Sequence, residues 1–258
     1  MHTFAILAAL TLAAPASAVA NPAFDGTWRG AVEVPGQPLA VTRIDLVADT
    51  KTALADVPAL AALALAQDVP GIAVAVVRDG RVVYLQGFGL RDVDKKLPVT
   101  ASTRFMIGST TKAFTTALLG TLVDAGTIKW DARVRDLIPG FALEDEFASS
   151  RCTVRDLVNH RTGLPRHDML WYGDKNATRA DVTRRVRYLQ PSADLREKFQ
   201  YNNLGFVIAG NVVDEKAGMS WERALQERIL APLGMRETTA ALADLRASSE
   251  RATGYAVR

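Results

Sequence analysis

The sequence contains a single cysteine, Cys152, in 258 residues, so the chain can form no internal disulfide. We interpret Cys152 as a small buried apolar side chain. The chain has three histidines, and one of them, His2, lies near the amino terminus, so a zinc site is not expected. No internal repeat and no low-complexity segment are present. We therefore expect a globular protein that uses no metal and no cofactor.

The sequence also lacks a strong excess of charge of one sign. Lysine and arginine number 31 against 28 acidic residues, and the net charge of +3 is spread along the chain. The arginine-rich residues 183–187 are interpreted as a solvated helix face. Hydrophobic residues make up 48% and charged residues 23%, as in ordinary soluble domains. We expect no nucleic-acid partner.

No apolar run is long enough to span a bilayer, and the run at residues 4–14 is shorter than a transmembrane helix requires. Small residues follow it in the pattern Ala16-Ser17-Ala18, with a second choice at 18–20. We predict a signal peptide over residues 1–20, and thus a periplasmic or secreted protein. No cysteine follows the cleavage region, so a lipid anchor and a membrane span in the mature chain are not expected.

After this segment, residues 27–34 and 39–47 are predicted to form a β-hairpin around a Pro35-Gly36 turn, within an N-terminal segment at 21–50. An Ala/Leu-rich helix is predicted at 53–67. The apolar run at 72–77 indicates a strand covered on both faces, and Asp79-Gly80 then turns the chain into a second strand at 81–88. Beyond residue 130 the pattern is mostly helical.

The helical part contains two clear start signals. Thr153 is predicted to cap a helix at 154–159, and Ser220 opens another helix that ends near Leu230.

The stretch from Phe105 to Phe114 carries the first candidate site. A strand-like apolar run reaches Gly108, and a helix is predicted to begin at Ser109. Lys112 follows three residues later, so its amine and the Ser109 hydroxyl share one helix face. The pair is a candidate nucleophile and base. A helix cap with a solvated lysine is the simpler explanation for this pattern alone.

A second candidate pattern, Tyr201-x-Asn203, follows the polar loop at 191–200 and precedes an apolar helix at 204–213. At such a junction a phenol and an amide share one exposed turn. Taken alone, the pattern also fits a partly buried tyrosine beside an asparagine cap.

Together, Ser109-x-x-Lys112 and Tyr201-x-Asn203 resemble the first two sequence boxes of the serine β-lactamase and penicillin-binding-protein superfamily. The Tyr-x-Asn form is similar to the class C branch, which includes DD-peptidases, D-aminopeptidases and esterases. The resemblance covers roughly residues 55–257. It implies an α/β (α+β) fold with an antiparallel sheet flanked by helices and a mostly helical subdomain. Further landmarks are Val69-Pro70-Gly71-Ile72, Gly87-Phe88-Gly89, residues 157–165 and residues 231–235.

The resemblance also implies roles. Ser109 would be the nucleophile that forms an acyl-enzyme, Lys112 or Tyr201 its base, and Asn203 would bind Lys112 and a substrate amide. The backbone N–H of Ser109 would face the oxyanion. Substrates would be β-lactams, D-amino-acid peptides or small esters. His160 is assigned a structural role and His167 a surface role, because no carboxylate is placed to complete a triad.

The third sequence box of the family, a Lys/His-Thr/x-Gly pattern after Tyr201, is absent. Residues 161–163 come too early in the chain, and residues 216–218 end a helix. We therefore expect a truncated domain at 51–258 that lacks its C-terminal sheet strands, with weak or no activity.

The absence of the third sequence box leaves a second interpretation open, namely a catalytically impaired relative that recognises peptidoglycan fragments or a protein partner. A purely structural helical protein would require both boxes to be coincidence. The sequence does not indicate an oligomeric state.

Overall fold

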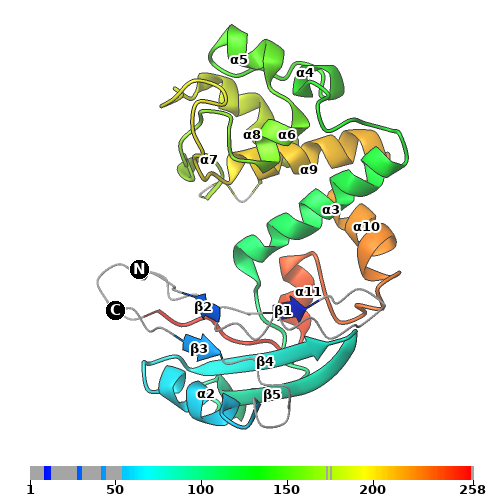
Figure 1. Cartoon of the computed structure of the whole chain (residues 1–258). Helices are drawn as coiled ribbons and strands as arrows, with labels where there is room; N and C mark the ends of the chain where they lie inside the picture. Colours follow the sequence, from blue (N-terminus) through cyan, green and yellow to red (C-terminus); the bar gives the residue numbers. More distant parts are fainter. Residues whose placement is uncertain are drawn as a thin grey trace. The chain divides into compact units, whose positions relative to one another are not determined.

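The computed structural model describes residues 9–12, 28–30, 42–44, 54–172, 174 and 176–256. They belong to two compact units (Figure 1). The first, called the sheet unit, comprises Met1–Ile107 and Arg246–Arg258. The second, called the helical unit, is the continuous segment Gly108–Leu245.

The centre of the sheet unit is the hairpin of β4 (Gly71–Arg78) and β5 (Arg81–Asp92). Asp79 and Gly80 form its turn with positive φ angles of 49° and 71°, the backbone that a tight two-residue hairpin requires. The predicted strands and turn are confirmed here. The predicted helix is also present, as α2 (Val57–Leu65), which packs against the hairpin.

The sheet has the strand order β1-β4-β5-β6. The short β6 (Leu97–Pro98) pairs antiparallel with β5, whereas β1 (Ala9–Leu12) pairs parallel with β4. Apart from β1, the predicted signal peptide and its cleavage positions lie outside the described residues. The parallel β1–β4 pair is a feature that the sequence did not predict.

A separate two-stranded sheet is formed by β2 (Trp28–Gly30) and β3 (Thr42–Ile44), which pair antiparallel. This agrees with the predicted hairpin. The rest of that hairpin, including the Pro35-Gly36 turn, lies outside the described residues.

The C-terminal residues of the chain return to the sheet unit. The guanidinium of Arg91 donates to Glu250 at 3.0 Å, and the backbone N–H of Thr253 donates to the Arg91 carbonyl at 2.7 Å. Arg104 forms an isolated parallel bridge with Arg251. These contacts explain why residues after 245 belong with the sheet although they follow the helical unit in the chain.

The helical unit begins with a 3₁₀ turn, η2 (Gly108–Thr110), that continues into α3 (Thr111–Asp124). The predicted strand before it is wrong, because residues 105–107 form no strand. The remaining helices are α4 (Val134–Leu137), α5 (Glu146–Arg151), α6 (Val154–Val158), α7 (Met169–Tyr172), α8 (Arg179–Arg185), η3 (Val186–Tyr188), α9 (Leu204–Ala217), α10 (Trp221–Leu225), the π-helical η4 (Gln226–Leu230) and α11 (Leu242–Ala247), which runs past the boundary of the unit.

Two long helices form the core of this unit, α3 in green and α9 in yellow-orange in Figure 1. They contact each other, and α9 also packs against α6, α8 and α10. Leu118 and Leu122 of α3 and Ile208 and Val212 of α9 are almost completely buried, at the three- to four-residue spacing that makes one apolar helix face. This packing fixes the helix ends that carry the candidate site.

The predicted helix starts at Thr153 and Ser220 are confirmed. Thr153 and Asp156 form a reciprocal capping box at α6, and the Ser220 side chain accepts from the backbone N–H of Arg223. Cys152 is fully buried, as expected, and burial raises the pKa of its thiol.

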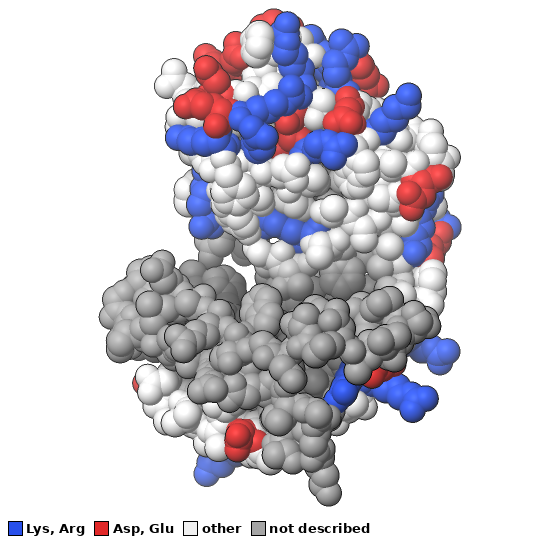
Figure 2. All heavy atoms as spheres, in the orientation of Figure 1, with Lys and Arg blue, Asp and Glu red and all other residues white. Residues whose placement is uncertain are grey.

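Charges of both signs are interspersed on the visible face of the helical unit (Figure 2). Within the same unit, Arg179 of α8 forms ion pairs with both Asp214 and Glu222. Within the part of the chain that the structure describes, no helix is long and apolar enough to cross a membrane.

Candidate active site

Ser109 and Lys112 lie on the first turns of the η2–α3 segment, as the sequence predicted. Lys112 Nζ donates a hydrogen bond to Ser109 Oγ at 3.1 Å. Ser109 is exposed and Lys112 is partly buried, so the hydroxyl is open to an incoming molecule while the amine is held behind it.

Tyr201 reaches the same point from a loop 92 residues later. Its phenol oxygen lies 2.5 Å from Ser109 Oγ, at the short limit for a hydrogen bond between two oxygens. The Lys112 ammonium lies 4.8 Å from the centre of the Tyr201 ring. The serine hydroxyl therefore has both a phenol and an amine within reach of its proton.

Asn203 is the fourth residue of the site and contacts Lys112. Its side-chain oxygen accepts from Lys112 Nζ at 2.8 Å, and its side-chain nitrogen donates to Asp168 Oδ1 at 2.9 Å. The other oxygen of Asp168 pairs with Arg166 at 2.7 Å. Since Asp168 accepts from the amide nitrogen, the amide oxygen is turned toward Lys112.

The chain around Asn202 explains why Tyr201 and Asn203 face α3. Asn202 is 1% exposed, and its side chain donates to the Leu164 carbonyl and accepts from the backbone N–H of Gly205. A Cβ at position 205 would lie 2.7 Å from the Leu157 carbonyl oxygen, so only glycine allows α9 to approach α6 this closely. The buried asparagine thus leaves its two neighbours pointing outward on one turn.

Two further aromatic groups pack against the site. His160 lies beside Tyr201 with 4.6 Å between ring centres, and Phe206 lies 5.4 Å from Lys112 Nζ. His160 is buried and makes no triad, in agreement with the structural role predicted for it. His167 is partly exposed and lies 3.3 Å from the Gln190 carbonyl oxygen.

The electrostatics of the site favour the ionised form of Tyr201. Burial alone would raise the pKa of the phenol, but the hydrogen bonds with Lys112 and Ser109 and the positive charges of Lys112 and Arg166 lower it below its ordinary value. The phenolate is therefore populated at lower pH than in a free tyrosine.

The structure brings all four predicted site residues together, namely Ser109, Lys112, Tyr201 and Asn203. Asp168 and the contact of His160 with Tyr201 were missed by sequence reasoning. The only sequence signal for Asp168 is its place in a polar loop, and nothing in the sequence links it to Asn203.

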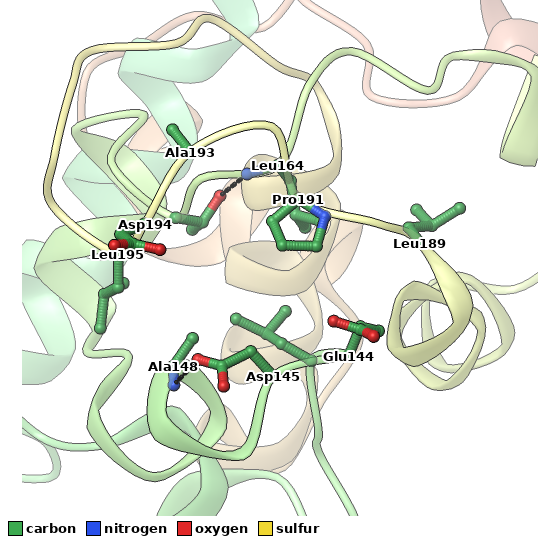
Figure 3. Close-up of a pocket in the computed structure, with 11 residues that line it drawn as sticks. Glu144, Asp145, Ala148, Leu164, Leu189, Pro191, Ala193, Asp194 and Leu195 are labelled. Carbon is green, nitrogen blue, oxygen red and sulfur yellow. Dashed lines mark hydrogen bonds between the residues drawn. The ribbon is translucent and has the colours of Figure 1, made fainter.

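Figure 3 shows a pocket elsewhere in the helical unit, between the start of α5 and the loop that follows η3. Its wall is partly acidic, with Asp145 turned back onto the backbone N–H of Ala148 as the cap of α5. None of the four site residues lines it. Among the described residues, no group of three or more histidine, cysteine or acidic side chains is placed to hold a metal ion.

Comparison with known proteins shows the family to which the chain belongs. The family model described as Beta-lactamase matches residues 47–256. This chain therefore belongs to the β-lactamase family, within the superfamily of serine β-lactamases and penicillin-binding proteins that the two boxes indicated.

Individual relatives point to hydrolases of several kinds. The chain is 40% identical over 196 residues to an unguisins hydrolase of Aspergillus campestris. The aligned region covers 72% of this chain and 36% of that protein. The octameric penicillin-binding protein homologue of Pyrococcus abyssi is 29% identical with a TM-score of 0.69, covering 79% of this chain and 48% of its own. The D-amino acid amidase of Ochrobactrum anthropi is also 29% identical, with a TM-score of 0.60 and coverage of 69% and 50%. The chain thus spans half or less of the length of these relatives.

Proposed function

We propose that this chain carries the nucleophile half of an exported serine hydrolase that works through an acyl-enzyme on Ser109. The observation that supports it best is the 2.5 Å contact between Ser109 Oγ and the Tyr201 phenol, with Lys112 donating to the same hydroxyl. A serine hydroxyl becomes a useful nucleophile only when a base receives its proton. Both groups that can receive this proton are in place.

Of the two, Tyr201 is proposed as the immediate base. It is nearer to Ser109 than Lys112 is, and its pKa is lowered, which increases the fraction of phenolate at a given pH. Lys112 then acts as a cation that stabilises the phenolate, and Asn203 holds Lys112 in place. Membership of the family does not show whether Tyr201 or Lys112 is the base. The assignment therefore rests on the two distances to Ser109 Oγ and on the lowered pKa of Tyr201.

In the proposed reaction, the phenolate of Tyr201 takes the proton of Ser109 as Oγ bonds to the substrate carbonyl carbon. The backbone N–H of Ser109 donates to the oxyanion. Tyr201 then gives the proton to the leaving nitrogen or oxygen, and the bond from that atom to the carbonyl carbon breaks. Water attacks the resulting ester, Tyr201 takes its proton, and Ser109 leaves with that proton. The enzyme returns to its starting state.

Substrates are proposed to be β-lactams, D-amino-acid peptides or amides, or small esters. The relatives support the β-lactam and amide members of this range, because their names include a penicillin-binding protein homologue and a D-amino acid amidase. Each of these substrates has a carbonyl carbon that a serine can attack, and the proposed steps are the same for all. Export rests on the predicted signal peptide at residues 1–20, whose cleavage would remove β1 from the sheet. Mass spectrometry of the mature amino terminus tests it.

The decisive experiment is to incubate the purified chain with a fluorescent penicillin, a fluorophosphonate and D-phenylalanine amide. The Ser109→Ala variant is the matched control. Intact mass should show an adduct of at least one reagent on Ser109, formed slowly if the missing third box weakens the reaction, that is absent from the control. If adducts form equally on both proteins, or on neither, the acyl-enzyme proposal is wrong.

A second candidate function is a binding protein for peptidoglycan fragments or a protein partner. The absence of a third sequence box favours it. It predicts saturable binding of a muropeptide, measured by calorimetry, without any covalent adduct and with no effect of Ser109→Ala.

A further inference from the structure

His160 is a buried titratable group at the site that the proposed reaction does not use. It is 7% exposed and sits among three aromatic rings. Its ring centre lies 4.6 Å from that of Tyr201, 5.3 Å from that of Phe206 and 5.4 Å from that of Phe199. The Tyr201 ring thus rests on the imidazole on one side of the site.

Hydrogen bonds join His160 to the same segment. The Nδ1 atom of His160 accepts from the backbone N–H of Asn202 at 3.3 Å, and its carbonyl oxygen accepts from the backbone N–H of Gln200 at 2.8 Å. These two bonds bracket Tyr201 in the chain. An imidazole nitrogen that accepts a hydrogen bond carries no proton, so this arrangement requires the neutral imidazole with its proton on Nε2.

The backbone of His160 is also unusual. Its φ angle is +56°, in the left-handed region that residues with a Cβ rarely adopt. Strained backbone of this kind persists where the surrounding structure holds it, and it is found preferentially at functional sites. Here the strain places the ring under Tyr201.

From these contacts we propose that His160 is a positioning residue that holds the Tyr201 phenol against Ser109, and that it does so only as a neutral imidazole. The proposal rests on the function proposed above, because it assigns His160 a part in the reaction of Ser109. It is distinct from a Ser-His pair, since the imidazole touches Tyr201 rather than the serine.

Protonation of His160 would undo this arrangement. Nδ1 would become a donor facing the donor N–H of Asn202, so the hydrogen bond that joins the imidazole to the Tyr201 segment would be lost. The titratable groups that act on the ring are Lys112 from α3 and Tyr201 from the loop before α9, and Phe199 and Phe206 carry no charge. Burial and the charge of Lys112 lower the pKa of His160, which keeps the imidazole neutral near pH 7.

Two variants separate the parts of this role. His160→Asn keeps an acceptor near the position of Nδ1 and tolerates the left-handed backbone, but it removes the ring. His160→Phe keeps a ring and removes the acceptor. The control is His167→Asn, since His167 also has a positive φ of 43° and lies outside the proposed machinery. Circular dichroism and thermal unfolding confirm that each variant is folded.

The first measurement is the rate of Ser109 labelling by the fluorophosphonate between pH 5 and pH 9. Misplacing a reacting group by an ångström costs on the order of 100-fold, so we expect each His160 variant to be about 10- to 100-fold slower at pH 8 and the control to be unchanged. The ratio of the wild-type rate to the His160→Asn rate should shrink as the pH falls through the pKa of His160, which burial and the charge of Lys112 lower below its ordinary value, because only the wild type loses its alignment. A purely structural role gives a ratio that does not depend on pH.

The second measurement needs no activity. Ultraviolet titration of the phenol, assigned with Tyr201→Phe, should show the lowered pKa of Tyr201 returning toward 10 in both His160 variants. If wild-type Ser109 is labelled but the variants match it in rate, in pH dependence and in the Tyr201 titration, the positioning role is wrong and the hydrolase proposal stands. If Ser109 is never labelled but the Tyr201 pKa shifts as expected, the hydrolase proposal fails and the positioning of Tyr201 by His160 stands.

Discussion

Asp168 offers the sharpest test of how the site is assembled, because one hydrogen bond joins it to Asn203. Its carboxylate accepts from Asn203 Nδ2 at 2.9 Å, and this bond decides which end of the amide faces Lys112. In Asp168→Ala the nitrogen end of the amide loses its acceptor, so the orientation in which its oxygen faces Lys112 is less firmly held. The acceptor of Lys112 would then be placed less precisely.

The size of the effect follows from the geometry. A hydrogen bond to a charged group contributes about 1.5–3 kcal/mol, and the Asp168 side chain is 27% exposed, which places this bond at the lower end. A loss of about 1.4 kcal/mol in the transition state is a tenfold loss of rate. We therefore expect Asp168→Ala to label Ser109 about 10-fold more slowly, whereas Asp168→Asn, which keeps an acceptor oxygen, should lose less.

A double-mutant cycle with Asn203→Ala tests whether Asp168 acts on the site through Asn203. If Asp168 acts through Asn203, then Asp168→Ala should change the labelling rate little once the amide is gone. Stopped-flow fluorescence with the labelled penicillin measures all four rates. An equal loss in both backgrounds would show that Asp168 affects the site by another route, such as its pair with Arg166.

Three further outcomes are expected. Gly205→Ala should lower the free energy of unfolding by about 1–3 kcal/mol in a urea titration, because its Cβ meets the Leu157 carbonyl, whereas Gly120→Ala, with only one side-chain atom at 4.0 Å, should be neutral or stabilising. Arg179→Leu leaves two half-buried carboxylates without their partner and should cost about 2 kcal/mol by the same titration; a loss below 0.5 kcal/mol, about the size of an ordinary surface change, would contradict this. Tyr201→Phe should slow Ser109 labelling by about 100-fold or more. The wild-type rate should rise with pH through a midpoint below 10, because the phenolate forms above the lowered pKa of Tyr201, and the variant should lose this rise. A variant that keeps the rise would make Lys112 the base.

Much of the site could be predicted from sequence because its two halves are local patterns. Ser109 and Lys112 are three residues apart on one helix, and helix geometry alone brings them together. Tyr201 and Asn203 flank a buried residue at a helix start, which fixes their common direction. What joined the halves was the resemblance to a family, since nothing local relates residues 92 apart.

Asp168 and His160 were harder for a physical reason. Each touches the site through a contact that spans more than 30 residues and depends on how the loops at 160–168 and 191–200 are packed. The left-handed backbone at His160 could not be predicted from the sequence, because histidine, although enriched at positive φ, adopts this conformation at only a small fraction of its positions. At residues 105–107 the sequence predicted a strand that the structure does not contain. A short apolar run is enough to match a strand pattern, but a strand forms only where a neighbouring strand can pair with it.

The order of the two units along the chain has a consequence for biosynthesis. The sheet unit is interrupted, with its two parts on either side of the continuous segment Gly108–Leu245. During translation the helical unit is therefore complete before the sheet unit receives its last residues, and domains generally fold as units while the chain is made. Every side chain placed at the site, from Ser109 to Phe206, belongs to that uninterrupted segment. The residues of the candidate site can therefore come together on the ribosome before Glu250 of the sheet unit has been synthesised.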